Sequence, residues 1–317
     1  MSIIVNAENF ARAESDLMFS RVHADAGSVN RWNHFRVPAP LDHQNIVRLN
    51  RDTLYSACIA DLAEPVVLTV PESGERYLSV MVVNQGHYIP RIFHAAGEYR
   101  LTEEDFGSRY VMLGARILVD PSDPEDVAEV NALQDGLGIA STSDTPFELP
   151  DYDQASQKAT RDALLRLADG LADFRHGFGR ADEVDPVRHL LCTAAGWGGL
   201  PDYEATYLNV VPGLPVGEYQ LRVVDPPVDA FWSISLYNAE GYFEPNALGV
   251  NNLNSITSVK DADGGTTVRF GVSPNGEPNY LPIMEGWNFM VRLYRPRAEI
   301  LDGTWQLPEV TRVGSEA

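Results

Sequence analysis

The chain has 317 residues, 44% of them hydrophobic and 22% charged, and its formal net charge is −21. This length supports one large domain or two ordinary ones, each with a sizeable core. So acidic a surface repels nucleic acid and anionic lipid, so we expect neither as a partner. No apolar run is long enough to span a membrane, and the N-terminal residues lack the pattern of a secretion signal. We therefore expect a cytoplasmic protein.

The first half of the sequence indicates a β domain between two helices. Residues 7–20 have the apolar spacing of a helix. Short apolar or β-branched runs, separated by glycine and proline, follow at residues 46–49, 66–70, 77–83 and 110–119. No helix alternates with these runs, so we expect antiparallel strands. Residues 123–135 predict a second helix, because Pro124 suits the first helical position and acidic residues favour its N-terminal end.

The second half predicts helices and then strands. A polar linker at 141–150 precedes helices at 156–172 and 185–196, and strands follow at 219–224, 230–237, 266–270 and 288–294, with a hairpin turn at 261–265. The expected fold is mainly β with a helical connector: two β-sandwich, jelly-roll-like domains packed together. We place the first domain at residues 1–140, the connector at 141–200 and the second domain at 201–317.

Signatures of cofactor or nucleophile sites are missing from the sequence. It contains no G-x-S-x-G, H-E-x-x-H or Walker motif, and no G-x-G-x-x-G after a strand. Cys58 and Cys192 form no metal-binding pattern, and two buried thiols are favoured over a disulfide. We expect no cofactor. A metal ion held by the histidines at 34, 43 and 94 stays open, although their spacing matches no known ligand pattern.

Several motifs occur in a fixed order along the chain. They include N-R-D-T-L-Y-S at residues 50–56, V-D-P-V-R-H at 184–189, A-G-W-G-G at 195–199, V-D-A-F-W-S-I-S at 228–235 and the segment 291–305. Together they resemble the paired domains of unknown function numbered 1254 (N-terminal) and 1214 (C-terminal), over about residues 30 to 312. The chain is similar to a compact subgroup of that family. The resemblance implies two β-sandwich-like domains and brings no settled reaction or catalytic residue.

Two positions depart from the pattern of the compact relatives. Gly86 stands before the His-Tyr pair where relatives often have an acidic residue, and Tyr280 stands where they often have cysteine. Such changes fit an altered substrate or a lost activity.

The densest polar cluster is the motif at residues 50–55. Asp52 can act as a general base or acid, with Asn50 or Tyr55 binding a substrate oxygen. The same residues can instead form a buried salt bridge and hydrogen-bond network that holds a turn. The sequence leaves both interpretations open.

Three further positions allow a functional and a structural interpretation. His87 follows a strand and a glycine, where histidine can exchange protons, although a surface histidine without a role is slightly more common. Arg292, between apolar strand residues, can bind a substrate carboxylate or form a structural ion pair. Trp232 can line an apolar pocket or fill a sandwich core.

The leading functional prediction is an enzyme that acts on a small organic molecule by acid/base chemistry, of hydrolase, lyase or isomerase type. Its pocket is expected between the two β domains, and Asp52→Asn is expected to abolish turnover without changing the melting temperature. Predicted catalytic residues are Asp52, His87 and Tyr55, and predicted substrate contacts are Asn50, Arg51, Arg292 and Trp232.

Two other classes of protein stay open. One is a non-catalytic β-sandwich module that binds a carbohydrate or another polar ligand. The other is an assembly protein whose charged motifs are fully paired and dry. The expected partner is a small molecule, and a homo-oligomer is compatible with the sequence.

Overall fold

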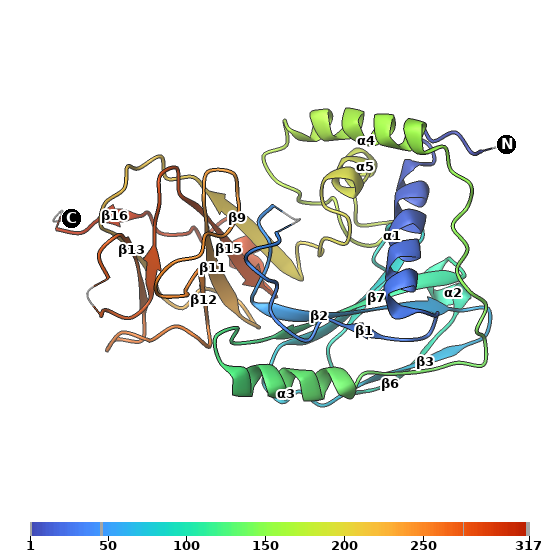
Figure 1. Cartoon of the computed structure of the whole chain (residues 1–317), viewed down its shortest axis with the longest axis horizontal. Coiled ribbons are helices and arrows are strands. Elements are labelled where there is room, and N and C mark those ends of the chain that lie inside the picture. Colours follow the sequence, from blue (N-terminus) through green and yellow to red (C-terminus); the bar gives the residue numbers. More distant parts are fainter. Residues whose placement is uncertain (1, 45–46, 275, 315–317) are drawn as a thin grey trace. The chain divides into compact units, whose positions relative to one another are not determined.

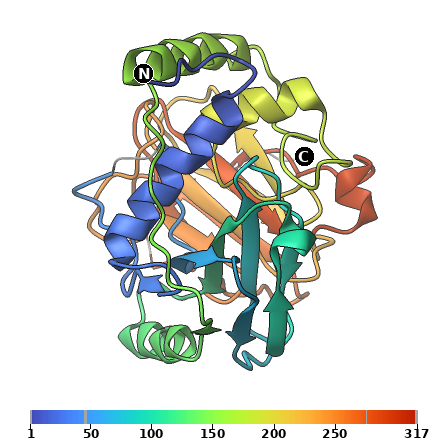
Figure 2. The ribbon, with the colours of Figure 1, turned by 90° about the vertical axis from the view of Figure 1, so that its right-hand side faces the viewer.

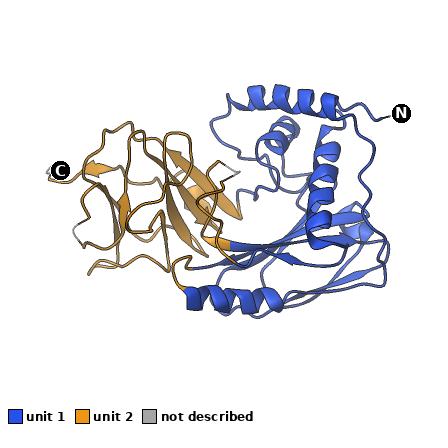
Figure 3. Cartoon of the chain, in the orientation of Figure 1, with its two compact units in different colours: residues 1–36, 54–119, 124–202 blue, residues 37–53, 120–123, 203–317 orange. Residues whose placement is uncertain are grey.

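A computed structural model describes residues 2–44, 47–274 and 276–314. The chain divides into two compact units (Figure 3). Unit 1 comprises residues 1–36, 54–119 and 124–202, and unit 2 comprises residues 37–53, 120–123 and 203–317. The helical segment expected as a separate connector thus belongs to unit 1. Residues 50–53 of the polar motif belong to unit 2 and its Tyr55 to unit 1.

Unit 1 contains two sheets that share one hydrophobic core. The five-stranded sheet has the order β1 (Asn33–His34), β2 (Thr53–Asp61), β7 (Tyr110–Leu118), β4 (Leu78–Asn84) and β5 (Arg91–Phe93). The three-stranded sheet has the order β6 (Gly97–Leu101), β3 (Val66–Val70) and β8 (Gly138–Ala140). Leu68 on β3, Val80 on β4 and Leu113 on β7 lie in the shared core without solvent exposure. Two sheets around one core make unit 1 a β-sandwich.

Three helices cover one side of this sandwich: α1 (Phe10–Ala26), α4 (Gln154–Ala168) and α5 (Pro186–Ala195). Figures 1 and 2 both show them grouped together within unit 1, and Phe10, Leu164 and Leu191 form their small common core. The start of α5 follows from its sequence, because the Asp185 carboxylate accepts hydrogen bonds from the two amides of Val187 and Arg188. Two more helices, α2 (Glu103–Phe106) and α3 (Pro124–Asp135), belong to the same unit.

Unit 2 contains two four-stranded sheets. One has the order β14 (Tyr280–Pro282), β13 (Thr266–Gly271), β10 (Tyr219–Val223) and β16 (Thr311–Arg312). The other has the order β12 (Asn252–Asn254), β11 (Trp232–Tyr237), β15 (Asn288–Tyr294) and β9 (Ala205–Val210), and a short helix, α6 (Ala298–Leu301), follows. Aromatic residues fill the space between the sheets: the ring of Phe270 lies 5.1 Å from Phe289 and 5.2 Å from Trp287. Unit 2 is therefore a second sandwich.

The predicted fold class, mainly β with additional helices, is confirmed. The helix predicted at 123–135 is α3, and the strands predicted at 219–224, 230–237, 266–270 and 288–294 are β10, β11, β13 and β15. In unit 2, β13 and β14 form a parallel pair.

Some local predictions were wrong. Residues 47–49 form a turn and a loop rather than a strand, and Ile46 lies outside the described residues. The strand is β2, a few residues later; most of its side chains are buried, so its sequence lacks the alternation of a half-exposed strand. The turn at 261–265 exists, with the Asp261 amide donating to the Gly265 carbonyl at 2.7 Å. It joins no hairpin, because β12 and β13 belong to different sheets.

Both cysteines are free and buried in unit 1, which confirms the predicted pair of thiols. Burial raises the pKa of Cys58 to about 12 and that of Cys192 to about 11, because the thiolate is poorly solvated there.

These pKa values predict a chemical and a thermodynamic result. Native protein at pH 8 should not react with a thiol-specific dye, and denaturant should expose both thiols. The folded state holds these protons more tightly than the unfolded chain, whose thiols ionise near the reference value of 9.0. The free energy of unfolding should therefore fall as pH rises above about 9. Dye uptake by folded protein at pH 8 would contradict the assignment.

Candidate functional site

A buried ion pair lies at the centre of the polar network in unit 2. Asp52 precedes β2 and is 0% exposed, and Arg292, in the middle of β15, is 2% exposed. Arg292 Nη1 lies 3.7 Å from Asp52 Oδ2. Two charges removed from water in this way need hydrogen bonds from their surroundings.

The Asp52 carboxylate accepts these hydrogen bonds from three neutral side chains. Ser233 Oγ donates at 2.6 Å, Asn252 Nδ2 at 2.8 Å and Asn254 Nδ2 at 3.4 Å. Strand register explains their convergence, because Ser233 on β11 pairs with both Asn254 on β12 and Arg292 on β15. Alternation along each strand places residues two apart on the same face.

The guanidinium of Arg292 also donates hydrogen bonds to backbone carbonyl and side-chain hydroxyl oxygens. Nη1 donates to Ser235 Oγ at 2.7 Å, and Nη2 donates to the Arg48 carbonyl at 2.9 Å and to Tyr237 Oη at 2.8 Å. Tyr237 Oη also donates to the Leu49 carbonyl at 2.8 Å. Burial alone would lower the pKa of Arg292, but Tyr237 and Asp52 raise it overall, so the guanidinium stays charged.

The predicted contacts in unit 2 are mostly part of this network or of the core. Asn50 accepts from the Asp52 amide at 2.9 Å and donates to Tyr294 Oη at 3.0 Å. Trp232 packs in the sandwich core. A carboxylate with no solvent exposure cannot meet a substrate in this conformation, so the geometry matches the salt-bridge and hydrogen-bond interpretation of Asp52. Arg51 is different, because it has no part in the network.

The other two predicted catalytic residues belong to unit 1. Tyr55 lies on β2, half-buried, with Arg116 Cζ 5.6 Å from the centre of its ring. The structure therefore brings Asn50, Asp52 and Arg292 together within one unit, with Tyr55 and His87 in the other. The expected pocket between the two β domains stays a prediction.

His87 is completely buried, which corrects its interpretation as a surface histidine. Its Nε2 accepts from the Gly198 amide at 2.9 Å, so the ring proton lies on Nδ1, 2.7 Å from Thr193 Oγ1. Burial, and then the neighbouring His189, lower the pKa of His87 well below its ordinary value. His87 is therefore neutral at pH 7 and poorly placed to carry protons to a substrate.

His189 on α5 lies in a stack of rings with His87. The ring centres are 5.5 Å from His87 to His189 and 4.5 Å from His189 to Tyr88, the latter pair nearly parallel. His189 Nδ1 lies 3.1 Å from the Gly177 carbonyl, and Nε2 lies 3.0 Å from the Gly86 carbonyl. Both oxygens only accept, so the ring can donate to both only when both nitrogens carry a proton. His189 thereby connects the turn after β4 to the loop before α5.

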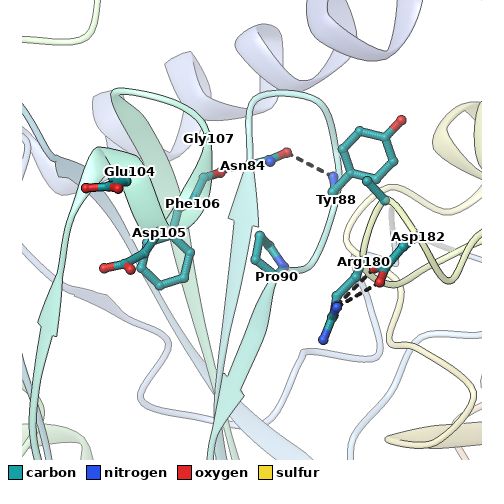
Figure 4. Close-up of a pocket in the computed structure, with 10 residues that line it drawn as sticks. Asn84, Tyr88, Pro90, Glu104, Asp105, Phe106, Gly107, Arg180 and Asp182 are labelled. Carbon is teal, nitrogen blue, oxygen red and sulfur yellow. Dashed lines mark hydrogen bonds and ion pairs between the residues drawn. The ribbon is translucent and has the colours of Figure 1, made fainter.

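These two segments border a cavity of about 420 Å³ in unit 1 (Figure 4). The cavity is lined by Asn84, Tyr88, Pro90, Glu104, Asp105, Phe106, Gly107, Arg180, Ala181 and Asp182. Asn84 fixes two of its walls: Oδ1 accepts from the Gly86 and Tyr88 amides, and Nδ2 donates to the Phe106 carbonyl at 3.0 Å. None of the sequence-predicted site residues lines this cavity. Its lining comes from three separate segments without a common motif, so the sequence offered no signal for it.

Negative charge dominates the cavity lining. The lining contains three acidic residues, Glu104, Asp105 and Asp182, and one basic residue, Arg180, whose Nη2 donates to Asp182 at 2.8 Å. This hydrogen bond lowers the pKa of Asp182. Among the described residues, the Tyr88 hydroxyl and the Glu104 carboxylate have no hydrogen-bond partner, so both can serve a ligand.

Within residues 2–44, 47–274 and 276–314, no three histidine, cysteine or acidic side chains are grouped to hold a metal ion. Over the same residues, none of the helices has the length and apolarity of a membrane span.

Comparison with known families agrees with the motif pattern. Residues 29–141 match the protein of unknown function DUF1254, and residues 215–298 match the protein of unknown function DUF1214. The chain belongs to the family that carries this pair of domains. No curated protein matches the sequence.

Two solved structures share the fold of this family member. The VPA0106 protein of Vibrio parahaemolyticus has a TM-score of 0.78 at 20% identity, over 97% of both chains. An uncharacterized protein from Burkholderia cenocepacia has a TM-score of 0.50 at 15% identity, over 98% of this chain and 90% of its own. At these identities the likeness concerns the fold alone.

The buried ion pair predicts a large loss of stability for Asp52→Asn. The change leaves Arg292 without its carboxylate and directs a new amide donor at the donors of Ser233 and Asn252. We expect the free energy of unfolding to fall by about 3–5 kcal/mol in urea denaturation. Asp229→Asn is the control, because its ion pair with Arg297 is half-exposed and should matter little. Unchanged stability in Asp52→Asn would restore the catalytic interpretation.

His87 predicts an acid-sensitive component of stability. The pKa of His87 is lower in the folded state than the ordinary 6.5. Below pH 6.5, therefore, His87 is protonated in the unfolded chain but stays neutral in the folded protein. Stability from this group is present above about pH 6.5 and is lost as pH falls, by up to about 1.4 kcal/mol per pH unit. The stability difference between wild type and His87→Gln should therefore narrow from pH 7 to pH 5. A constant difference would disprove the assignment.

Proposed function

We propose that this protein binds a small polar organic molecule in the cavity of unit 1. The observation that carries the proposal is the cavity itself, whose volume of about 420 Å³ falls in the range of small-molecule sites. Its walls are held by the Asn84 hydrogen bonds and by the ring stack of Tyr88 on His189. Walls fixed in this way reduce the ordering that a ligand must impose, which favours binding.

The lining favours a neutral or cationic ligand with several hydroxyl groups. Three carboxylates against one guanidinium repel anions and accept hydrogen bonds from hydroxyl or ammonium groups. Tyr88 and Pro90 add apolar surface for the carbon face of such a ligand. This combination suits a carbohydrate or an amino sugar, the class expected for a non-catalytic binding module.

Acid/base catalysis has less support. It needs a titrating group within hydrogen-bond reach of a substrate. Asp52 and His87 have no solvent exposure, and in the cavity Arg180 holds Asp182 in its ionised form. These observations favour binding over turnover.

A cytoplasmic location fits the cysteines. Both thiols are free, as is usual in a reducing compartment.

Three related sugars that differ in charge test the proposal. Saturation-transfer NMR with glucose, glucosamine and glucuronate should give binding in the order glucosamine, glucose, glucuronate, because carboxylates dominate the lining. Ala181→Trp places an indole in the cavity and should reduce glucosamine binding at least tenfold, whereas Ala181→Ser should keep it. Strongest binding by glucuronate, unchanged binding in Ala181→Trp, or no binding by any of the three would refute this assignment.

A further inference from the structure

None of the described residues pairs with the guanidinium of Arg51, in unit 2. The side chain is partly buried and its Nε is inaccessible to solvent and without a hydrogen bond. Among the described residues, Arg51 forms no ion pair, hydrogen bond or ring contact. Burial lowers its pKa, and no neighbouring carboxylate raises it. The positive charge of Arg51 is thus partly removed from water, and no hydrogen bond or ion pair with the described residues compensates for the lost solvation.

Carboxylates are abundant in this chain, which has 45 acidic and 24 basic residues. Many of its arginines lie within 4.0 Å of a carboxylate, including the exposed Arg180 and Arg297. Pairing stabilises least at such exposed positions and most where charge is desolvated. Arg51 is more desolvated than these surface arginines and would gain more from a carboxylate, yet none of the described carboxylates pairs with it.

The segment around Arg51 has an excess of positive charge. Asp52 is the acidic residue of this segment, and it is committed to Arg292 and three neutral donors. Arg48 donates from Nη1 to the neutral Asn209 side chain, and burial together with Arg292 lowers its pKa. Residues 48–52 thus carry two guanidinium groups and one carboxylate, which is committed to Arg292, in a protein whose net charge is −21. An anion is the ligand that this local charge attracts.

We propose that Arg51 is an anion-binding residue and that its ligand is a small-molecule monocarboxylate. The Nε–H and the adjacent Nη–H of an arginine form a two-donor edge that matches the two oxygens of a carboxylate. In Arg51 the Nε of this edge has no acceptor. A single carboxylate also matches the single unpaired charge, whereas a phosphate dianion would bring one charge more. This site is separate from the sugar-binding cavity proposed for unit 1.

The test compares the melting temperature in sodium acetate with that in sodium chloride at equal ionic strength. Acetate should raise the melting temperature of wild type, and Arg51→Gln should reduce the association constant for acetate at least tenfold. Arg51→Lys keeps the charge without the two-donor edge and should retain part of the effect. Arg295→Gln is the matched control, because Arg295 is an exposed arginine of the same unit without an ion pair, and it should respond as wild type does.

A second measurement separates binding from structure. In chloride alone, Arg51→Gln should melt at or above the wild-type temperature, because it removes a desolvated charge without a partner. A lower melting temperature, or the absence of an acetate effect in wild type, would overturn the proposal. Stabilisation by inorganic phosphate but not by acetate would overturn the carboxylate assignment. Ala181→Trp should keep the acetate effect, so failure of the unit 1 proposal is distinguishable from failure here.

Discussion

The ion pair of Asp52 and Arg292 is the constraint on which the arrangement of unit 2 depends. Both side chains are almost without solvent exposure, so each needs hydrogen bonds that only an ordered surrounding can supply. The carboxylate fixes side chains of β11 and β12, and the guanidinium fixes the backbone of residues 48 and 49. The motif that is densest in polar residues thereby holds the 37–53 segment within unit 2.

Unit 1 uses histidine rings for a comparable purpose. His87 and His189 connect α5, the turn after β4 and the loop before α5 through hydrogen bonds to Gly198, Gly86 and Gly177. The cavity lies beside these hydrogen bonds, since Asn84 and Tyr88 in its lining flank Gly86 and His87. In both units, therefore, the polar residues that stand out in the sequence form hydrogen bonds that hold parts of the same unit together. We therefore place the two proposed ligands by cavity lining and unpaired charge rather than by motif density.

The sequence anticipated the fold well where periodicity was clear. Helix α3 and strands β10, β11, β13 and β15 were predicted close to their observed bounds. Strand β2 escaped prediction because burial of most of its side chains removes the alternation that reveals a half-exposed strand. For the candidate site, the sequence identified Asn50, Arg51, Asp52 and Arg292 as residues of interest without showing that Asp52 and Arg292 form a buried ion pair. It also did not show that Arg51 has no part in that network.

The sequence by itself determined the fold class, the family pairing, the free thiols and some of the residues that form the polar networks. These depend on local pattern and composition, which a linear chain carries. Only the tertiary structure decided which charges are paired, which histidine rings are buried away from solvent, and where three segments far apart in sequence border a cavity. Such properties depend on desolvation and on contacts between residues far apart in sequence. An arginine with a partner and one without have the same local sequence signal, so Arg51 becomes distinctive only in the folded protein.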